Sequence, residues 1–186
     1  MAMALSARDA LSTLRGLAPH PAGPAAPQVW VGGRSQAVDL ASVWSKETAF
    51  LTDRMWPGPL TVIVPAYLDM VASDEPVVHL TMPAARGLRA LCRTAGPLAV
   101  GALLRPDGAA VVDPSAIGAR FSEDDLALIV DGGVCRGLPP TVVDCTVTPP
   151  RVRRVGALPE SYVDAALMMG ARRRRWFKRA GPGASR

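Results

Sequence analysis

The sequence has few of the residues that mark secreted, metal-binding or membrane proteins. It holds three cysteines, Cys92, Cys135 and Cys145, and this odd number without metal-like spacing argues against both a disulfide framework and a metal site. No apolar run is long enough for a bilayer-spanning helix, and the N-terminus lacks a charged region followed by an apolar stretch. We therefore expect reduced thiols, no metal ligands, no transmembrane segment and a cytoplasmic location.

The residues that are abundant indicate a folded protein with many turns. Apolar residues make up 49% of the chain, which excludes a disordered protein. The 18 prolines and 17 glycines imply frequent turns between elements. A chain of 186 residues suits a single domain with a substantial core.

Positive charge is concentrated at the C-terminal end. The segment from Ala171 to Arg186 holds seven of the 21 Lys and Arg and none of the 16 Asp and Glu, so the remainder has 14 basic against 16 acidic residues. Such a segment could contact RNA phosphates and stack on bases, although a solubilising or membrane-surface role is equally compatible. The RNA-binding candidates are Arg172, Arg173, Arg174, Arg175, Trp176, Lys178 and Arg179.

The strongest local signal of secondary structure lies between Trp56 and Pro65. Pro57 and Pro59 fix their own φ angles and bias the preceding residues away from helix, while Gly58 can adopt conformations that a side chain resists. A helix opened by Ser45 must therefore end near Trp56, and the following β-branched run indicates a buried strand.

Elsewhere the chain alternates between strand and helix patterns, which indicates an α/β layer architecture. Asp39 is a plausible helix cap, and Tyr162, Ala166 and Met169 are the expected buried face of the last helix. In the helix after Pro83 the expected buried residues are Leu88, Leu91 and Cys92. The other expected strands cover residues 28–32, 76–80, 97–104 (as a central strand), 126–130, 141–145 and 151–155. The other expected helices begin at Ser6, Pro83 and Glu160, and the last of them should end at Gly170.

Four segments, in order, resemble motifs of the YrdC-like family. Residues 55–61 resemble its aromatic-Trp-Pro-Gly-Pro-Leu-Thr signature, and residues 128–137 resemble its Asp-Gly-Gly-x-Cys turn. Residues 139–144 resemble Pro-Ser-Thr-Val-Val-Asp, and residues 150–158 resemble the closing Arg-x-Gly-Ala-Ile segment. Each match alone is weak, but the ordered set covers residues 28–158 and is specific.

The resemblance implies a twisted, open, mixed α/β sheet flanked by helices around a concave basic groove. It implies a family domain over residues 1–158, abbreviated at its N-terminus, followed by a helix and basic tail over residues 159–186. The family enzymes are L-threonylcarbamoyladenylate synthases of tRNA modification, which join threonine, bicarbonate and ATP, so ATP with Mg is a possible ligand. The positions implied to bind nucleotide or substrate are Gly58, Thr61, Thr141, Asp144 and Arg154.

Several family positions differ in this chain. The family's first strand motif, Pro-Thr-Asp-Thr-x-Tyr-Gly, has no counterpart, and no lysine occurs between Leu14 and Gln28 where phosphate-facing lysines are expected. The Arg-x-Pro motif is Thr81-Met82-Pro83, the Ser-Ala-Asn motif is Ala-Leu-Leu at residues 102–104, and the motif serine is Pro140.

These departures bear directly on catalysis. Because a single well-placed donor is worth about 3 kcal/mol in a transition state, losing several should reduce activity strongly. We therefore expect a divergent member that binds nucleotide or RNA with reduced or no catalysis. An active synthase with substituted residues and a non-catalytic partner-binding module are the alternatives; the oligomeric state stays open.

Overall fold

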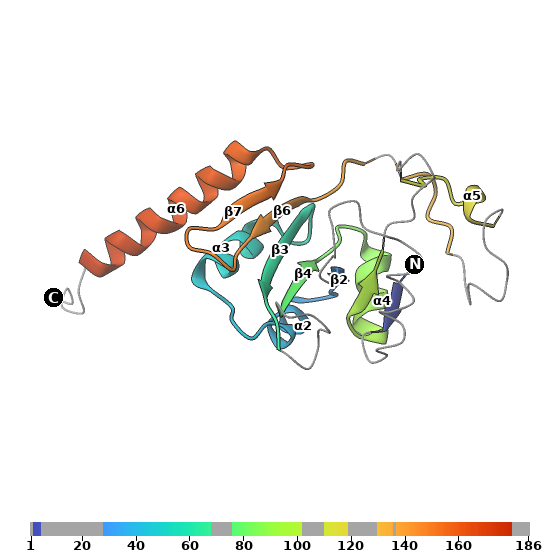
Figure 1. The fold of residues 1–186 in the computed structure, drawn as a ribbon, viewed down its shortest axis with the longest axis horizontal. Helices are drawn as coiled ribbons and strands as arrows, with labels where there is room; N and C mark the ends of the chain where they lie inside the picture. The colour runs from blue at the N-terminus through green and yellow to red at the C-terminus, as the bar shows by residue number, and fades with distance from the viewer. Residues whose placement is uncertain are drawn as a thin grey trace.

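One mixed sheet with helices around it forms the body of the molecule (Figure 1). The computed structural model describes residues 2–4, 28–67, 76–101, 110–118, 130–135 and 137–179. Within them, seven strands are ordered β1-β5-β2-β4-β3-β6-β7. The strands are β1 (Ala2–Ala4), β2 (Gln28–Trp30), β3 (Leu60–Pro65), β4 (Val77–Thr81), β5 (Leu98–Val100), β6 (Thr141–Asp144) and β7 (Arg151–Arg154). The helices are α2 (Arg34–Leu40), α3 (Lys46–Met55), α4 (Arg86–Ala95), α5 (Ser115–Gly118) and α6 (Glu160–Arg179).

The sheet is mixed, and its central strands are deeply buried among the described residues. β2 pairs with β4 and β3 with β6 in parallel, whereas the other neighbours are antiparallel. Leu60, Val62 and Val64 of β3 are fully buried, as the β-branched run predicts. The expected α/β class with an open, mixed sheet is therefore confirmed.

The helix before the elbow begins and ends as expected. Ser45 caps α3 by accepting a hydrogen bond from the Thr48 amide at 3.0 Å. The helix ends at Met55, because Pro57 cannot continue it. Gly96 ends α4 with a φ of 89°, a left-handed conformation that favours glycine.

The start of α4 differs from the expectation. The helix begins at Arg86 rather than at Pro83. The Arg89 guanidinium binds the carbonyls of Pro83 and Ala84, so these carbonyls do not start a helical ladder. The expected burial of Leu91 is also wrong: its side chain is exposed, whereas Cys92 is fully buried.

The last helix is longer and turned differently from the expectation. α6 spans 20 residues and extends past the sheet (Figure 1). Its buried face is formed by Val163, Ala166 and Gly170, while Tyr162 and Met169 are exposed, so only Ala166 of the expected stripe was right. The reason is packing on α3: a Cβ at Gly170 would lie 3.1 Å from the Phe50 ring.

Two further expectations, on Asp39 and on the position of β5, are wrong, and others fall on residues that the structure does not describe. Asp39 lies inside α2 and caps nothing, and β5 is second from one edge of the sheet rather than central. The helix expected from Ser6, most of the strand expected at 126–130, and residues 102–104 lie outside the described residues. Among the described helices, none has the length and apolar character that a membrane crossing requires.

Candidate functional site

Four of the five candidate binding residues lie at one end of the sheet. Because β3 and β6 are parallel, both begin at this end, and their antiparallel neighbours β4 and β7 finish there. The end therefore gathers Gly58, Thr61, Thr141 and Arg154, together with Thr81; we call these five residues the strand-end site. Asp144 lies at the other end of β6, three residues or about 10 Å from Thr141.

Gly58 holds the elbow against two neighbouring segments. Its amide donates to the Met82 carbonyl at 3.0 Å. A Cβ at this position would lie 2.4 Å from the Met55 carbonyl oxygen, so the backbone approach requires glycine. Trp56, which is joined to Pro57 by a cis peptide, donates its indole N–H to the Leu60 carbonyl at 2.8 Å. Gly58 is therefore held by close packing and by one backbone hydrogen bond.

Thr61 is paired with a residue that the sequence reasoning did not select. Its hydroxyl lies 2.7 Å from the Thr81 hydroxyl, across the β3–β4 pair, and both side chains are buried. Thr81 occupies the position of the arginine in the family's Arg-x-Pro motif, and that substitution was the signal that could have identified it. The two hydroxyls share one hydrogen bond, in which either can be the donor.

Thr141 joins β6 to the segment that follows β7. Its hydroxyl donates to the Leu158 carbonyl at 2.7 Å and accepts from the Gly156 and Leu158 amides at 2.9 and 3.0 Å. The side chain is fully buried. One donated and two accepted bonds use the full capacity of a hydroxyl group. Gly156 and Leu158 are partners that the sequence did not indicate.

Arg154 is the member of the strand-end site with donors to spare. Its side chain is exposed and has one hydrogen bond, from Nη2 to the Pro140 carbonyl at 3.2 Å. A guanidinium carries five N–H donors, so most of them face solvent. Among the described residues it has no carboxylate partner, and this free cation could bind an anionic group.

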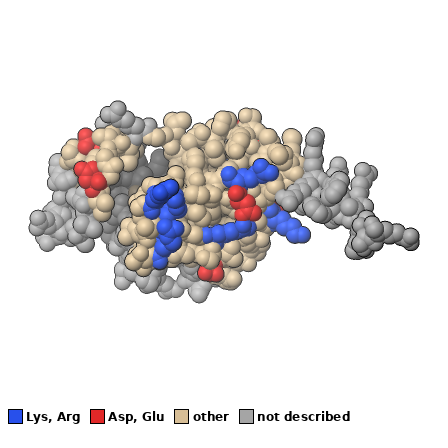
Figure 2. All heavy atoms as spheres, turned by 180° about the vertical axis from the view of Figure 1, so that it is seen from behind, with Lys and Arg blue, Asp and Glu red and all other residues tan. Residues whose placement is uncertain are grey.

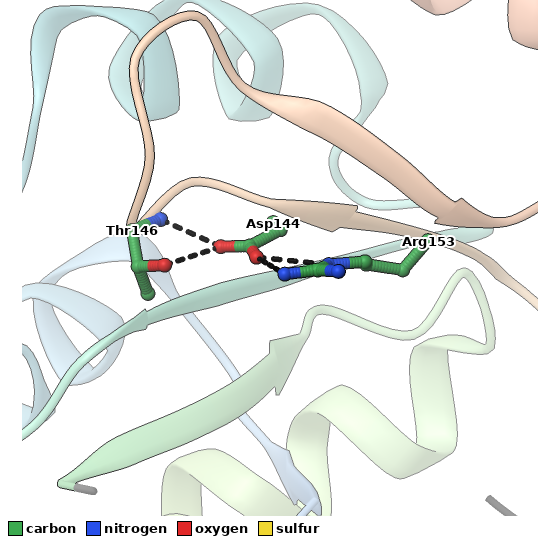
Figure 3. A network of polar contacts seen from close by, with 3 residues as sticks. All are labelled: Asp144, Thr146 and Arg153. Atoms are coloured by element: carbon green, nitrogen blue, oxygen red, sulfur yellow. Dashed lines mark hydrogen bonds and ion pairs between the residues drawn. The ribbon is translucent and has the colours of Figure 1, made fainter.

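Asp144 is the centre of a separate polar network (Figure 3). Its Oδ1 accepts from the amide and hydroxyl of Thr146 at 2.9 and 2.5 Å, and its Oδ2 accepts from Arg153 Nε and Nη2 at 2.9 and 2.6 Å. Burial alone would raise the pKa of this carboxyl, but the bonds from Thr146 and Arg153 outweigh it, so the pKa is lowered. Arg153 is a partner that the sequence reasoning missed.

The family model that matches this chain, Sua5_yciO_yrdC, described as "Telomere recombination", covers residues 28–156. That range is more than half of the chain. The chain belongs to the Sua5/YciO/YrdC family. The YrdC-like resemblance of its motifs is thereby confirmed.

Relatives of this family member include characterised proteins. The threonylcarbamoyl-AMP synthase of Pyrococcus abyssi is 29% identical over 137 residues, which cover 69% of this chain and 39% of the relative. The chain thus spans about two fifths of that relative's length. The structure of P. abyssi Sua5 complexed with L-threonine superposes with a TM-score of 0.76 at 25% identity, covering 88% of this chain and 49% of that chain. E. coli YciO gives 0.72 at 21% identity, covering 85% and 78%, and shows the fold alone.

The basic tail of this Sua5/YciO/YrdC protein continues the last helix. The backbone of α6 runs through Arg172–Arg175, Trp176, Lys178 and Arg179, whose side chains lie outside the described residues. The tail therefore begins as helix, which the expected end at Gly170 did not anticipate.

The Asp144 network predicts a specific pH dependence of stability. A carboxyl whose pKa is lower in the folded than in the unfolded state stabilises the fold above the unfolded pKa, about 3.9, and loses this contribution as the pH falls through the folded value. We expect the free energy of unfolding to fall with acidification below about pH 4, and to fall less steeply in Asp144→Asn. Urea denaturation from pH 2.5 to 7 measures both slopes, with Asp39→Asn, which changes an exposed carboxyl on α2, as the control. Equal slopes in wild type and Asp144→Asn would contradict this account.

Proposed function

We propose that this Sua5/YciO/YrdC protein binds a nucleotide or RNA with reduced or no synthesis of threonylcarbamoyl-AMP. The observation that supports the proposal is a difference in hydrogen bonding among the candidate binding residues. Thr61, Thr141 and Asp144 are hydrogen-bonded inside the protein, whereas Arg154 is exposed with free donors. One free cation suits binding of a phosphate group better than a multi-step reaction.

The described candidates do not fit a magnesium-bound triphosphate. Such a ligand needs several cationic donors around its phosphates and, usually, a carboxylate for the metal. The one carboxylate among the candidates, Asp144, is bound by Arg153 and Thr146 at the far end of β6. The arginine of the family's Arg-x-Pro motif is here Thr81, whose hydroxyl is occupied by Thr61. We therefore derive no adenylation step at this site.

RNA binding is assigned to the basic end of α6. Six Lys and Arg lie between Arg172 and Arg179 without an acidic residue, and Trp176 and Phe177 stand among them. Phosphate contacts from basic residues and stacking on aromatic rings are the general means of binding single strands. This tail follows the family domain, which we propose spans residues 1–158.

Two other functions have an observation in their favour. The similarity to the P. abyssi threonylcarbamoyl-AMP synthase favours an active enzyme in which other residues supply the missing groups. Exposed Tyr162, Met168 and Met169 on α6 favour a partner-binding module. The following experiment separates these functions.

Catalysis and nucleotide binding are measured on the same protein. With ATP, threonine and bicarbonate, we expect pyrophosphate release at background level. In calorimetric titration with ATP, we expect Arg154→Ala to weaken binding by about tenfold, since a charge-assisted hydrogen bond contributes about 1.5–3 kcal/mol when well formed and less when exposed. Arg34→Ala, which removes an exposed arginine of α2, is the control and should leave ATP affinity unchanged.

Each outcome assigns one function. Robust pyrophosphate release would overturn reduced catalysis and support the active enzyme. Absence of both release and ATP binding would leave RNA as the proposed ligand, or a protein partner if RNA also fails to bind. Equal affinity of wild type and Arg154→Ala would remove Arg154 from the nucleotide site.

A further inference from the structure

Helix α4 carries arginines along one side. Arg86, Arg89 and Arg93 are spaced by three and four positions, and at 3.6 residues per turn they fall within an arc of about 60°. The helix contains no acidic residue. We call these three side chains the arginine ridge; they belong neither to the strand-end site nor to the basic tail.

Two of the three ridge arginines contact neutral backbone carbonyls. Arg89 Nη1 donates to the carbonyls of Pro83 and Ala84 at 2.9 and 2.5 Å, and Arg93 Nη1 makes a long contact of 3.5 Å with the Gly32 carbonyl. Arg86 is exposed. None of the three pairs with a carboxylate among the described residues. The carboxylates of the described segments therefore leave the charge of these arginines uncompensated.

Figure 2 shows the consequence on the molecular surface. An elongated group of Lys and Arg atoms lies on the side of the body that holds α4, with neutral atoms along its length. In a second group, acidic atoms lie between the basic ones. The ion pairs Arg34–Asp53 and Arg153–Asp144 are examples of neutralised arginines elsewhere in the molecule. On this face, the uncompensated charge of the ridge thus forms a line.

The ridge stands on a fixed part of the backbone. A Cβ at Gly32 would lie 2.6 Å from both the Arg89 carbonyl oxygen and Arg93 Cγ, so the end of β2 and the middle of α4 are in tight contact. The Gln36 side chain adds a bridge, because it accepts from the Gly32 amide at 2.7 Å and donates to the Cys92 carbonyl at 2.8 Å. Anchored arginines lose less conformational freedom when they bind a ligand.

We propose that the arginine ridge binds the phosphate backbone of RNA, as a second contact surface besides the basic tail. At a rise of about 1.5 Å per residue, the ridge is about 10 Å long. Each of the three arginines along this length can contact one phosphate of a strand. Contacts of this kind position a nucleic acid without reading its sequence.

Two observations favour RNA over an acidic protein. The ridge repeats one cation at near-regular steps, which matches a regular line of phosphates, and a guanidinium binds a phosphate through two parallel N–H groups. The ridge also starts just after the β4 end of the strand-end site, because the chain runs from Thr81 through Pro83 directly into α4. This inference rests on the RNA part of the proposed function.

The test is RNA binding measured against salt concentration. Fluorescence anisotropy with a labelled single-stranded RNA compares wild type, the ridge variant (Arg86→Gln, Arg89→Gln, Arg93→Gln) and a variant truncated before Arg172. A charge-matched control replaces Arg34, Lys46 and Arg54, on α2 and α3, with Gln. With about 0.7 counterions released per phosphate, the ridge variant should lose about 2 from the slope of log K against log salt, and the control should lose less than 1.

The outcomes separate the ridge from the tail. If the ridge variant keeps the wild-type slope, the ridge inference is overturned, whereas truncation that abolishes binding would still support the tail. If full-length protein binds no RNA at low salt, both fail, and the ATP titration alone decides the nucleotide proposal. Polyglutamate and unlabelled RNA are also compared as competitors at equal concentrations of negative charge. If polyglutamate displaces the labelled RNA as well as unlabelled RNA does, the ridge is assigned to an acidic protein instead. Because Arg89 contacts the start of α4, the pair Arg86→Gln and Arg93→Gln is measured as well, with a slope loss of about 1.4 expected.

Discussion

Replacing Thr141 with valine should lower the free energy of unfolding by about 3–5 kcal/mol. Valine has nearly the same shape but no hydroxyl, so the Leu158 carbonyl and the amides of Gly156 and Leu158 would all lose their partner. Each buried polar group left without a partner costs about 1–3 kcal/mol, and partial hydration of the loop reduces the sum. Urea denaturation of the full chain measures the loss.

Two further variants test the cause of this loss. Thr141→Ser keeps the hydroxyl and should recover most of the stability, because it removes only a methyl group worth about 1 kcal/mol. Thr94→Val makes the same chemical change at an exposed site, where the hydroxyl donates to Ala90 of the same helix, and should change stability by less than about 0.5 kcal/mol. If Thr141→Val and Thr94→Val cost the same, the hydroxyl of Thr141 does not hold the segment after β7.

This expectation changes how a family motif is interpreted. Thr141 matches the Thr of the Pro-Ser-Thr-Val-Val-Asp motif, which suggests a ligand contact. The hydrogen bonds of its hydroxyl are instead made with the segment that follows β7. Loss of any activity in a Thr141 variant would therefore report loss of structure. Arg154 can be tested for binding with less risk, because its one hydrogen bond is exposed.

The fold was predictable where local rules are strict. The two prolines of the elbow, the Ser45 cap and the left-handed Gly96 each leave the backbone few choices, and the elements that they delimit lie close to their expected positions. The β-branched runs of β3 and β6 likewise gave strands. These features depend on residues close together in the chain, which a sequence displays directly.

Features set by long-range packing were not predictable. Tyr162-Ala166-Met169 and Val163-Ala166-Gly170 are both valid helical stripes on α6, and contact with Phe50 of α3 selects the second. The start of α4 depends on the Arg89 side chain, which binds carbonyls that a helix would otherwise use. Sheet order, with β5 beside β1 and β2, has no local signal at all.

In the candidate site, too, local features were predictable and long-range partners were not. The motifs selected four residues that lie together at one end of the sheet, because parallel strands β3 and β6 start there. The partners of these residues come from other strands: Thr81 from β4 and Gly156 from the loop after β7. Only the pairing register shows that Thr61 faces Thr81, and with it that the two hydroxyls share a hydrogen bond.

Replacing Gly58 with alanine should destabilise the protein by about 2–4 kcal/mol. The added Cβ would lie 2.4 Å from the Met55 carbonyl oxygen, a backbone atom at the end of α3 that cannot rotate away. Relief of this clash must move the elbow, and with it the hydrogen bond from the Gly58 amide to the Met82 carbonyl. Thermal and urea denaturation measure the loss.

Gly87→Ala is the matched control and should act in the opposite direction. A Cβ at Gly87 meets nothing within 4 Å, and alanine is favoured over glycine within a helix, so α4 should gain about 0.5 kcal/mol. Unchanged stability in Gly58→Ala would show that the elbow can move, and Gly58 would then be free to serve a ligand. A large loss, with weakened ATP binding only in proportion to the unfolded fraction, would mean that the best-matched family motif in this chain maintains the fold and does not contact the nucleotide.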